Sequence, residues 1–429
     1  MKKQLQGFAL GTAVLGSLLE TANGAGFIED SKATLDLRNF YYNSDTRDTH
    51  KATVDEWGQA FVLNVKSGFT TGTIGLGLDV IGTYAVKLDS SGPGALFPRK
   101  RNGQAVDDFS RGGLTGKLQF AKTEARVGTL LPSLPVISAN DGRLMPQLFE
   151  GAMVTSKDID NLSLTAGQIE HATGRMSSDT TGLAVAGGTR QSNKFRFVGG
   201  NYTPFDNVLL QYYFANLEDY YNQNFLGAMH SLKFDSGQSL KTDLRWFRTR
   251  GNGANAMGAP GYRTSGFTKN GDGKIDNNTW SSMFTYGVGG HAFSLGYQEV
   301  SDNSNFVQLN QGSLVDKDAG GTSLYLITDR MTASFNYAGE RTVLGQYGYD
   351  FASLGMPGIT ANLAYLKGDQ IKQIRGAEEW ERDFIVGYVV QSGGFKGVGV
   401  TWRNSSLRSD IGGDVDQNRM TVSYSLALW

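Results

Sequence analysis

The chain has 429 residues with 40 Lys and Arg against 41 Asp and Glu. Its near-neutral charge argues against non-specific nucleic-acid binding, which needs a basic surface. The 57 glycines are about twice the usual share of ~7%, but 8 prolines and no three-residue glycine period exclude collagen and proline-rich disorder. The lack of cysteine excludes disulfides, thiolate zinc sites and cysteine nucleophiles. No apolar run reaches the ~18 residues of a membrane-spanning helix.

The first residues are typical of a secretory signal peptide. Two lysines precede an apolar stretch over residues 7–19, and small residues follow it. We expect cleavage after Gly24 or nearby, so that residues 1–24 are the signal and residues 25–429 form one mature domain. The chain is therefore expected to leave a bacterial cytoplasm.

Beyond the signal, the hydrophobic pattern has a period of two, which is typical of strands with one apolar and one polar face. At residues 74–80, for example, Ile74, Leu76 and Leu78 alternate with glycine and aspartate. Such segments occur at residues 33–41, 59–68, 74–80, 162–168, 194–200, 208–215, 225–234, 240–246, 280–288, 292–298, 342–351, 359–366, 384–391, 398–404 and 419–428. No amphipathic helix, repeat or linker interrupts them, so the sequence predicts a single all-β domain.

The alternation alone fits two architectures, a soluble sandwich and a membrane barrel. A sandwich buries the apolar faces between two sheets, whereas a membrane barrel turns them toward lipid and keeps the polar faces around water. Charged pairs lie within the predicted strands at Asp36 and Arg38, Lys194 and Arg196, and Asp243 and Arg245. Aromatic residues near strand ends are typical of interfacial girdles, at Trp57, Tyr84, Trp246, Trp280, Trp402 and Trp429. These features favour an antiparallel transmembrane β-barrel.

The connections between the predicted strands come in two sizes. Tight turns are expected at residues 204–207, 235–238 and 356–358, and long polar loops at 89–113, 251–278 and 302–321. Short turns on one side and long loops on the other are typical of outer-membrane barrels, whose long loops face outward. The mature length fits 16 or 18 strands and does not decide between them.

Short motifs along the chain resemble the OprD family of substrate-specific porins, the outer-membrane carboxylate channels. The motifs are GFIEDS at residues 26–31, LRNFYY at 37–42, LLPSLP at 130–135, NDGRLMPQ at 140–147, LEDYY at 217–221, YDFASLGMPG at 349–358 and YVVQSG at 388–393. Their order is that of the family, and they span nearly the whole mature chain.

The resemblance implies an 18-stranded barrel with an inward-folded constriction loop in the outer membrane of a Gram-negative bacterium. It also implies passive uptake of small carboxylate-bearing nutrients (organic or aromatic acids, or amino acids) without enzymatic activity or a cofactor. Its expected partners are these solutes, outer-membrane lipid and lipopolysaccharide, but no nucleic acid. The expected assembly is a monomer or a loose trimer.

A narrow, water-filled pore for carboxylates needs cations to replace the water lost by the solute. Arginine suits this role because its planar fork makes two hydrogen bonds to a carboxylate and stays charged. Alternation places Arg38, Arg196, Arg245 and Arg403 on the inner face, and the resemblance places Asp141 and Arg143 in the constriction loop and Arg175 just after the next strand. The resemblance implies that these residues form a basic ladder and an eyelet.

Two observations limit this interpretation. Thr401 and Ala364 stand where basic-amino-acid channels of the family carry further arginines, so the ladder here is expected to be shorter. For any single arginine, the alternative role is a structural salt bridge to Asp or Glu within the lumen.

Other candidate chemistry is weaker. Residues 270–276 resemble the middle of a calcium loop, but Thr268 and Thr279 replace its first and last carboxylates. Four scattered histidines show no metal-ligand spacing, although His171 could line the pore. An outer-membrane hydrolase with a Ser–His site is the alternative function, and a plugged structural or adhesin barrel is a third class.

Overall fold

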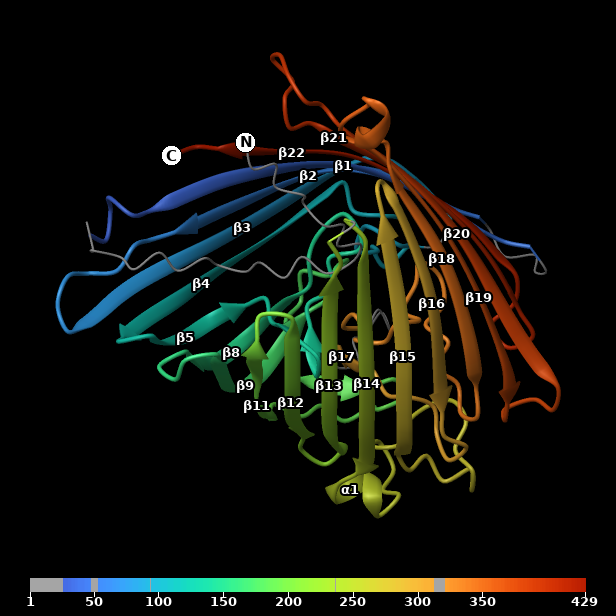
Figure 1. The fold of residues 1–429 in the computed structure, drawn as a ribbon. Helices are drawn as coiled ribbons and strands as arrows, with labels where there is room; N and C mark the ends of the chain where they lie inside the picture. Colours follow the sequence, from blue (N-terminus) through green and yellow to red (C-terminus); the bar gives the residue numbers. More distant parts are fainter. Residues whose placement is uncertain (1–25, 48–52, 93, 236, 312–320) are drawn as a thin grey trace.

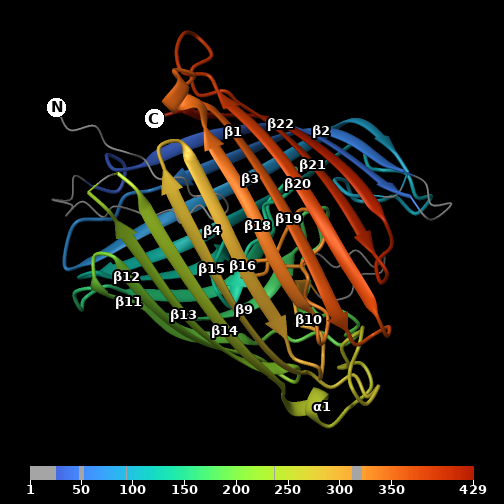
Figure 2. The same ribbon diagram turned by 45° about the vertical axis from the view of Figure 1, so that its right-hand side comes forward.

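The structure is a computed structural model that describes residues 26–47, 53–92, 94–235, 237–311 and 321–429. The signal segment and its cleavage site lie outside these residues. An 18-stranded antiparallel sheet closes on itself, because β1 pairs with β2 on one side and with β22 on the other. Figures 1 and 2 show the strands inclined around a single barrel. The predicted all-β barrel with 18 strands is confirmed.

The barrel strands are β1 (Lys32–Thr46), β2 (Val54–Lys66), β3 (Ile74–Ser91), β4 (Asp108–Phe120), β5 (Thr123–Leu130), β8 (Leu148–Ser156), β9 (Leu162–Thr173), β11 (Phe195–Phe205), β12 (Val208–Leu217), β13 (Tyr221–Lys233), β14 (Ser239–Gly251), β15 (Asp276–Val288), β16 (His291–Val300), β18 (Arg341–Asp350), β19 (Ile359–Ile371), β20 (Ala377–Val389), β21 (Gly399–Ser409) and β22 (Val415–Ala427). Short elements lie in the connections: β6 (Ser133–Leu134), β7 (Ile137–Ser138), β10 (Leu183–Val185), β17 (Leu309–Gln311), α1 (Gly253–Ala256) and the 3-10 helix η1 (Phe351–Leu354). Within the described ranges, no helix is long and apolar enough to cross a membrane.

Each barrel strand has an outer and an inner face, as the period of two predicts. On β3, Ile74, Leu76 and Leu78 are exposed on the outside, whereas Ile81 and Ala85 are buried on the inside. The predicted girdle residues Trp57, Tyr84, Trp246, Trp280, Trp402 and Trp429 all lie on the outer surface. An outer surface of exposed apolar and aromatic side chains is what a lipid-facing barrel requires.

Three barrel strands, β4, β5 and β8, were not predicted from the sequence. Glycines in β4 and charges in β5 interrupt the apolar positions that mark a strand. The predicted loop over residues 89–113 is therefore wrong at both ends, because β3 extends to Ser91 and β4 begins at Asp108. The start of β20 was also missed, because its inner face carries the acidic residues Glu379, Glu381 and Asp383.

The two ends of the barrel differ in their connections. Short turns such as β11–β12 and β13–β14 lie at the end where β22 finishes, while α1 and the long connections lie at the opposite end (Figure 1). Since outer-membrane barrels place long loops outside the cell, the α1 end is the extracellular end.

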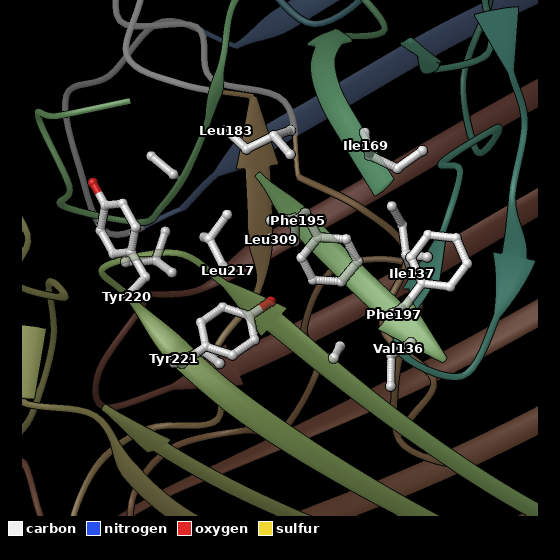
Figure 3. Packing of buried hydrophobic residues seen from close by; sticks show 14 of the residues in the cluster. Val136, Ile137, Ile169, Leu183, Phe195, Phe197, Leu217, Tyr220, Tyr221 and Leu309 are labelled. Carbon is white, nitrogen blue, oxygen red and sulfur yellow. The ribbon is translucent and has the colours of Figure 1, made fainter. Parts of the chain in front are cut away.

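Long extracellular connections fold back into the barrel and fill part of it. Val136 and Ile137 from the β5–β8 connection, and Leu183, which lies in β10, pack with inward residues of β11–β14 (Figure 3). We call the inward residues Phe195, Phe197, Tyr213, Phe225 and Phe247 the apolar wall; all are buried in this cluster. A smaller apolar cluster holds the β3–β4 connection against β1 and β2, where Gly58 leaves the space that Phe97 occupies.

Candidate functional site in the barrel lumen

The opposite side of the barrel carries ionic side chains on its inner face. We call these residues the charged wall: Glu379, Glu381 and Asp383 on β20, Arg403 on β21, Arg419 on β22 and Arg38 on β1. Arg403 and Arg419 are direct cross-strand partners, and Arg419 lies opposite Tyr42 of β1. Arg403 and Arg419 therefore bring two positive charges together at one height of the lumen. This arrangement costs stability, because like charges directly opposite each other destabilise a sheet.

The β5–β8 connection (residues 131–147) is a constriction loop held by this wall. Arg38 makes a bidentate ion pair with Asp141, at 2.7 Å from Nη1 to Oδ1 and 3.0 Å from Nη2 to Oδ2. Its Nη1 also donates to the backbone carbonyl of Arg143 at 2.7 Å. From β22, Arg419 Nη1 donates to the carbonyl of Gly142 at 3.3 Å. Arg38 and Arg419 thus use part of their hydrogen-bonding capacity to position the loop.

Two further arginines join the constriction loop to its neighbours. Arg143 donates to the carbonyl of Ala95 at 2.7 Å, and its guanidinium lies 5.2 Å from the centre of the Tyr42 ring. Arg175 Nη1 donates to Asn140 Oδ1 at 3.0 Å. Burial, followed by repulsion from Arg143 and Arg419, lowers the pKa of Arg175 to about 9. Arg175 therefore keeps its charge at neutral pH.

Arg403 differs from these arginines because its hydrogen-bonding groups are unused. Its Nε is buried without a partner, and its side chain makes no hydrogen bond or ion pair to any residue in the described ranges. Its neighbours include Arg38, which repels it, and Asp383, which attracts it. Outward Trp402 precedes it on the strand, so the predicted inward orientation of Arg403 is observed. It is an inward-facing guanidinium without a protein partner among the described residues.

Arg245 also points inward, but it lies on the side of the apolar wall. It pairs with Asp243 at 2.7 Å, donates to the carbonyl of Tyr325 at 3.2 Å and stacks 4.0 Å from the centre of that ring. These contacts correspond to the structural salt bridge that the sequence left open for each arginine. The geometry gives Arg245 a role in holding the β17–β18 connection.

The inward orientation predicted for Arg196 is wrong. On β11 the inner positions are Phe195 and Phe197, which are buried in the apolar wall, while Arg196 and Val198 are exposed on the outer face. The prediction assumed that the polar face of every strand lines water. Here the folded-in loops cover the inner face, so the aromatic residues turn inward and the arginine turns outward.

Several lumen arginines were missed in the sequence, including Arg126, which faces inward on β5 and pairs with Glu124. Arg111 on β4 donates to the carbonyl of Gly174 at 2.8 Å while its Nε and Nη2 remain without partners, and its strand had not been predicted. Arg330 lies in the β17–β18 connection, where no periodicity could indicate its direction. Arg419 could have been found, because it lies on the polar face of the predicted last strand.

The calcium-like segment and the histidines form no metal or Ser–His site among the described residues. In the calcium-like segment, Asp276 pairs with Arg248, and no cluster of metal-ligating side chains occurs among the described residues. His171 contacts Asn193 and Glu150, His230 contacts Asn207, and His291 contacts Tyr347. None of these three histidines contacts a serine hydroxyl, so the described part of the chain offers no Ser–His pair. Thr401 and Ala364 lie on the inner face and add no charge.

Comparison with known proteins decides the family. The family model for the outer membrane porin, OprD family, matches residues 25–428. The chain belongs to the OprD family of outer membrane porins. This porin is 35% identical over 424 residues to the porin-like protein GalP of Pseudomonas putida, covering 97% of each chain. It therefore lies in the outer membrane of a Gram-negative bacterium, and its relatives are channels.

Solved structures support the same assignment. The crystal structure of Pseudomonas aeruginosa OccK8 (OprE) is similar with a TM-score of 0.87 and 47% identity, over 94% of this porin and 100% of that chain. The crystal structure of Pseudomonas aeruginosa OpdK with vanillate is similar with a TM-score of 0.84 and 35% identity, over the same shares. None of these relatives supports the hydrolase alternative.

Proposed function

We propose that this porin is selective for small carboxylate-bearing solutes, which cross the constriction by contacting arginines of the charged wall. The observation that carries the proposal is Arg403, a lumen guanidinium with no protein partner in the described structure. Arg419, directly opposite in the sheet, adds a second positive charge at the same height. A carboxylate accepts two hydrogen bonds from such a planar fork, which compensates for the water it loses.

The other lumen arginines support a shorter ladder with divided roles. Arg38 and Arg143 chiefly hold the constriction loop, whereas Arg403 and Arg111 keep donors without a partner among the described residues. Several weak sites in series let an ion enter and leave without being trapped. The relative OpdK was crystallised with vanillate, a carboxylate, which favours the same solute class.

Uptake into proteoliposomes tests the proposal. A panel of radiolabelled aliphatic and aromatic carboxylates is compared with uncharged analogues of equal size, using the wild type and Arg403→Ala. We expect carboxylate uptake by Arg403→Ala to fall about five- to thirtyfold, because one charge-assisted hydrogen bond contributes about 1–2 kcal/mol. Uncharged analogues should pass both proteins equally.

Arg403→Lys separates charge from geometry. Lysine restores the positive charge but not the planar fork, so anion preference should return further than carboxylate uptake. Equal slowing of charged and neutral solutes by Arg403→Ala would show that the residue only shapes the pore. Wild-type carboxylate uptake in a correctly folded Arg403→Ala barrel would refute its role.

A further inference from the structure

The outer face of β9 and β11–β15 carries an apolar hollow of about 880 Å³. Small residues form its floor: Gly200 on β11, Ala228 on β13 and Ser282 on β15. Large outward side chains surround them, namely Leu164, Val198, Tyr202, Leu210, Tyr212, Leu226, Leu244, Trp246 and Trp280. Because this surface faces lipid, a hollow of this kind has the shape and polarity to hold acyl chains.

A polar row borders the hollow on the extracellular side. The pairing register aligns Arg196 on β11, Asn216 on β12, Asn222 on β13 and Arg250 on β14 across the outer face. Toward the extracellular end, the row lies two residues beyond Val198 on β11 and four residues beyond Trp246 on β14. Each of the four residues is next to the extracellular end of its strand, the level at which we expect the outer-leaflet headgroups.

The two arginines at the ends of this row have unused donors. Among the described residues, exposed Arg250 makes no hydrogen bond or ion pair, and the only side-chain hydrogen bond of Arg196 is from Nε to Gln168 at 3.0 Å. Neighbouring carboxylates are already paired, Asp276 with Arg248 and Glu218 with Lys194. Both guanidinia are therefore available to an anion from outside.

The spacing of the arginines favours a lipid with two anionic groups. Arg196 and Arg250 are separated by three interstrand steps, or roughly 14 Å at about 4.8 Å per step. The headgroup of phosphatidylglycerol has one phosphate and can reach only one of them. A glycolipid with a phosphate at each end of its headgroup can contact both while its acyl chains enter the hollow.

We propose that this outer face is a binding site for the bisphosphorylated lipid A part of lipopolysaccharide. Arg196 and Arg250 bind the two phosphates, the amides of Asn216 and Asn222 contact the sugar between them, and the hollow over Ala228 takes an acyl chain. The site is separate from the lumen and does not depend on which solute the channel carries. It also gives a function to Arg196, which does not face the pore.

Native mass spectrometry of the full-length barrel in detergent tests the site by titration with bisphosphorylated lipid A, monophosphorylated lipid A and phosphatidylglycerol. We expect bisphosphorylated lipid A to bind most tightly. The double variant Arg196→Gln and Arg250→Gln should weaken it roughly 25-fold, since each basic residue at a lipid surface contributes about fivefold. The matched control is Arg341→Gln, an exposed interfacial arginine that pairs with Glu299 instead; this control should bind as the wild type does.

A second variant tests the apolar half of the site. Ala228→Leu fills the hollow on a lipid-facing position, so it should lower affinity for lipid A severalfold while leaving channel conductance unchanged. Unchanged lipid A affinity in the double arginine variant would overturn the proposal. Equal affinities for phosphatidylglycerol and bisphosphorylated lipid A would also overturn it. If the variants changed only the self-association of the barrel, the proposal would fail and the face would be a protein interface.

Discussion

The charged wall and the apolar wall belong to one continuous sheet, yet the inward side chains are ionic on the first and aromatic on the second. Along β20–β22 and β1, the inner positions carry carboxylates and guanidinia, including the opposed pair Arg403 and Arg419. Along β11–β14, the inner positions are aromatic; Phe225 packs 4.7 Å from Phe247 and 5.5 Å from Tyr325 between ring centres. Both walls expose apolar residues to lipid on the outside.

The difference shows that the inner face of a barrel strand is set by what covers it. Where the folded-in loops press against the wall, aromatic side chains are buried on both sides, as in a soluble core. Where the β17–β18 connection covers the charged wall, buried ionic side chains bond its backbone instead: Glu381 accepts from the amides of Thr332 and Ala333, and Arg419 donates to the carbonyl of Met331. The two walls therefore differ in what they contact, apolar side chains on one side and polar backbone groups on the other.

The largest effect is expected from breaking the apolar wall. Phe225→Ala removes a fully buried ring that contacts Phe247 and Tyr325, so it should destabilise the barrel by about 3–5 kcal/mol. Urea unfolding in lipid vesicles, followed by tryptophan fluorescence, measures the change. The matched control is Leu226→Ala on the lipid-facing side of the same strand, which leaves no internal cavity. Equal losses in both variants would contradict a packed inner wall.

A smaller effect is expected from releasing the constriction loop. Asp141→Asn removes the bidentate ion pair with Arg38, which is partly exposed and is expected to contribute about 1 kcal/mol. The loop should then fluctuate more, which gives noisier single-channel currents and faster passage of neutral sugars. Asp36→Asn changes the lumen charge equally on the strand of Arg38 without contacting the loop, and it should leave sugar passage unchanged. If Asp141→Asn and Asp36→Asn have the same effect, the charge of the lumen, rather than the ion pair between Asp141 and Arg38, controls the passage of sugars.

The smallest effect on transport is expected from Arg196. Because its side chain lies outside the barrel, Arg196→Gln should change carboxylate uptake by less than twofold and the free energy of unfolding by no more than about 0.5 kcal/mol. Carboxylate uptake into proteoliposomes, measured for Arg196→Gln and Arg403→Ala in the same assay, makes this comparison. A loss of uptake as large as that of Arg403→Ala would show that the Arg196 side chain acts in the lumen after all.

The sequence predicted the class of fold and two arginines of the charged wall, but neither the rest of that wall nor the division between the two walls. Period-two alternation located most strands and the inward orientation of Arg38 and Arg403, because a strand has only two faces. It failed at Arg196, since alternation cannot tell which face a loop from elsewhere in the chain will cover. The buried carboxylates of β20 were missed for a related reason: Glu381 accepts backbone hydrogen bonds at Thr332 and Ala333, from a distant connection.

The most direct test of the account is the reversal potential of single channels under a KCl gradient, measured for the wild type, Arg403→Ala and Arg403→Lys. If solutes pass beside the unpaired guanidinium of the charged wall, Arg403→Ala should shift the reversal potential toward cation preference and Arg403→Lys should restore most of the wild-type value. An Arg403→Ala channel that is correctly folded and keeps the wild-type reversal potential would contradict the central claim.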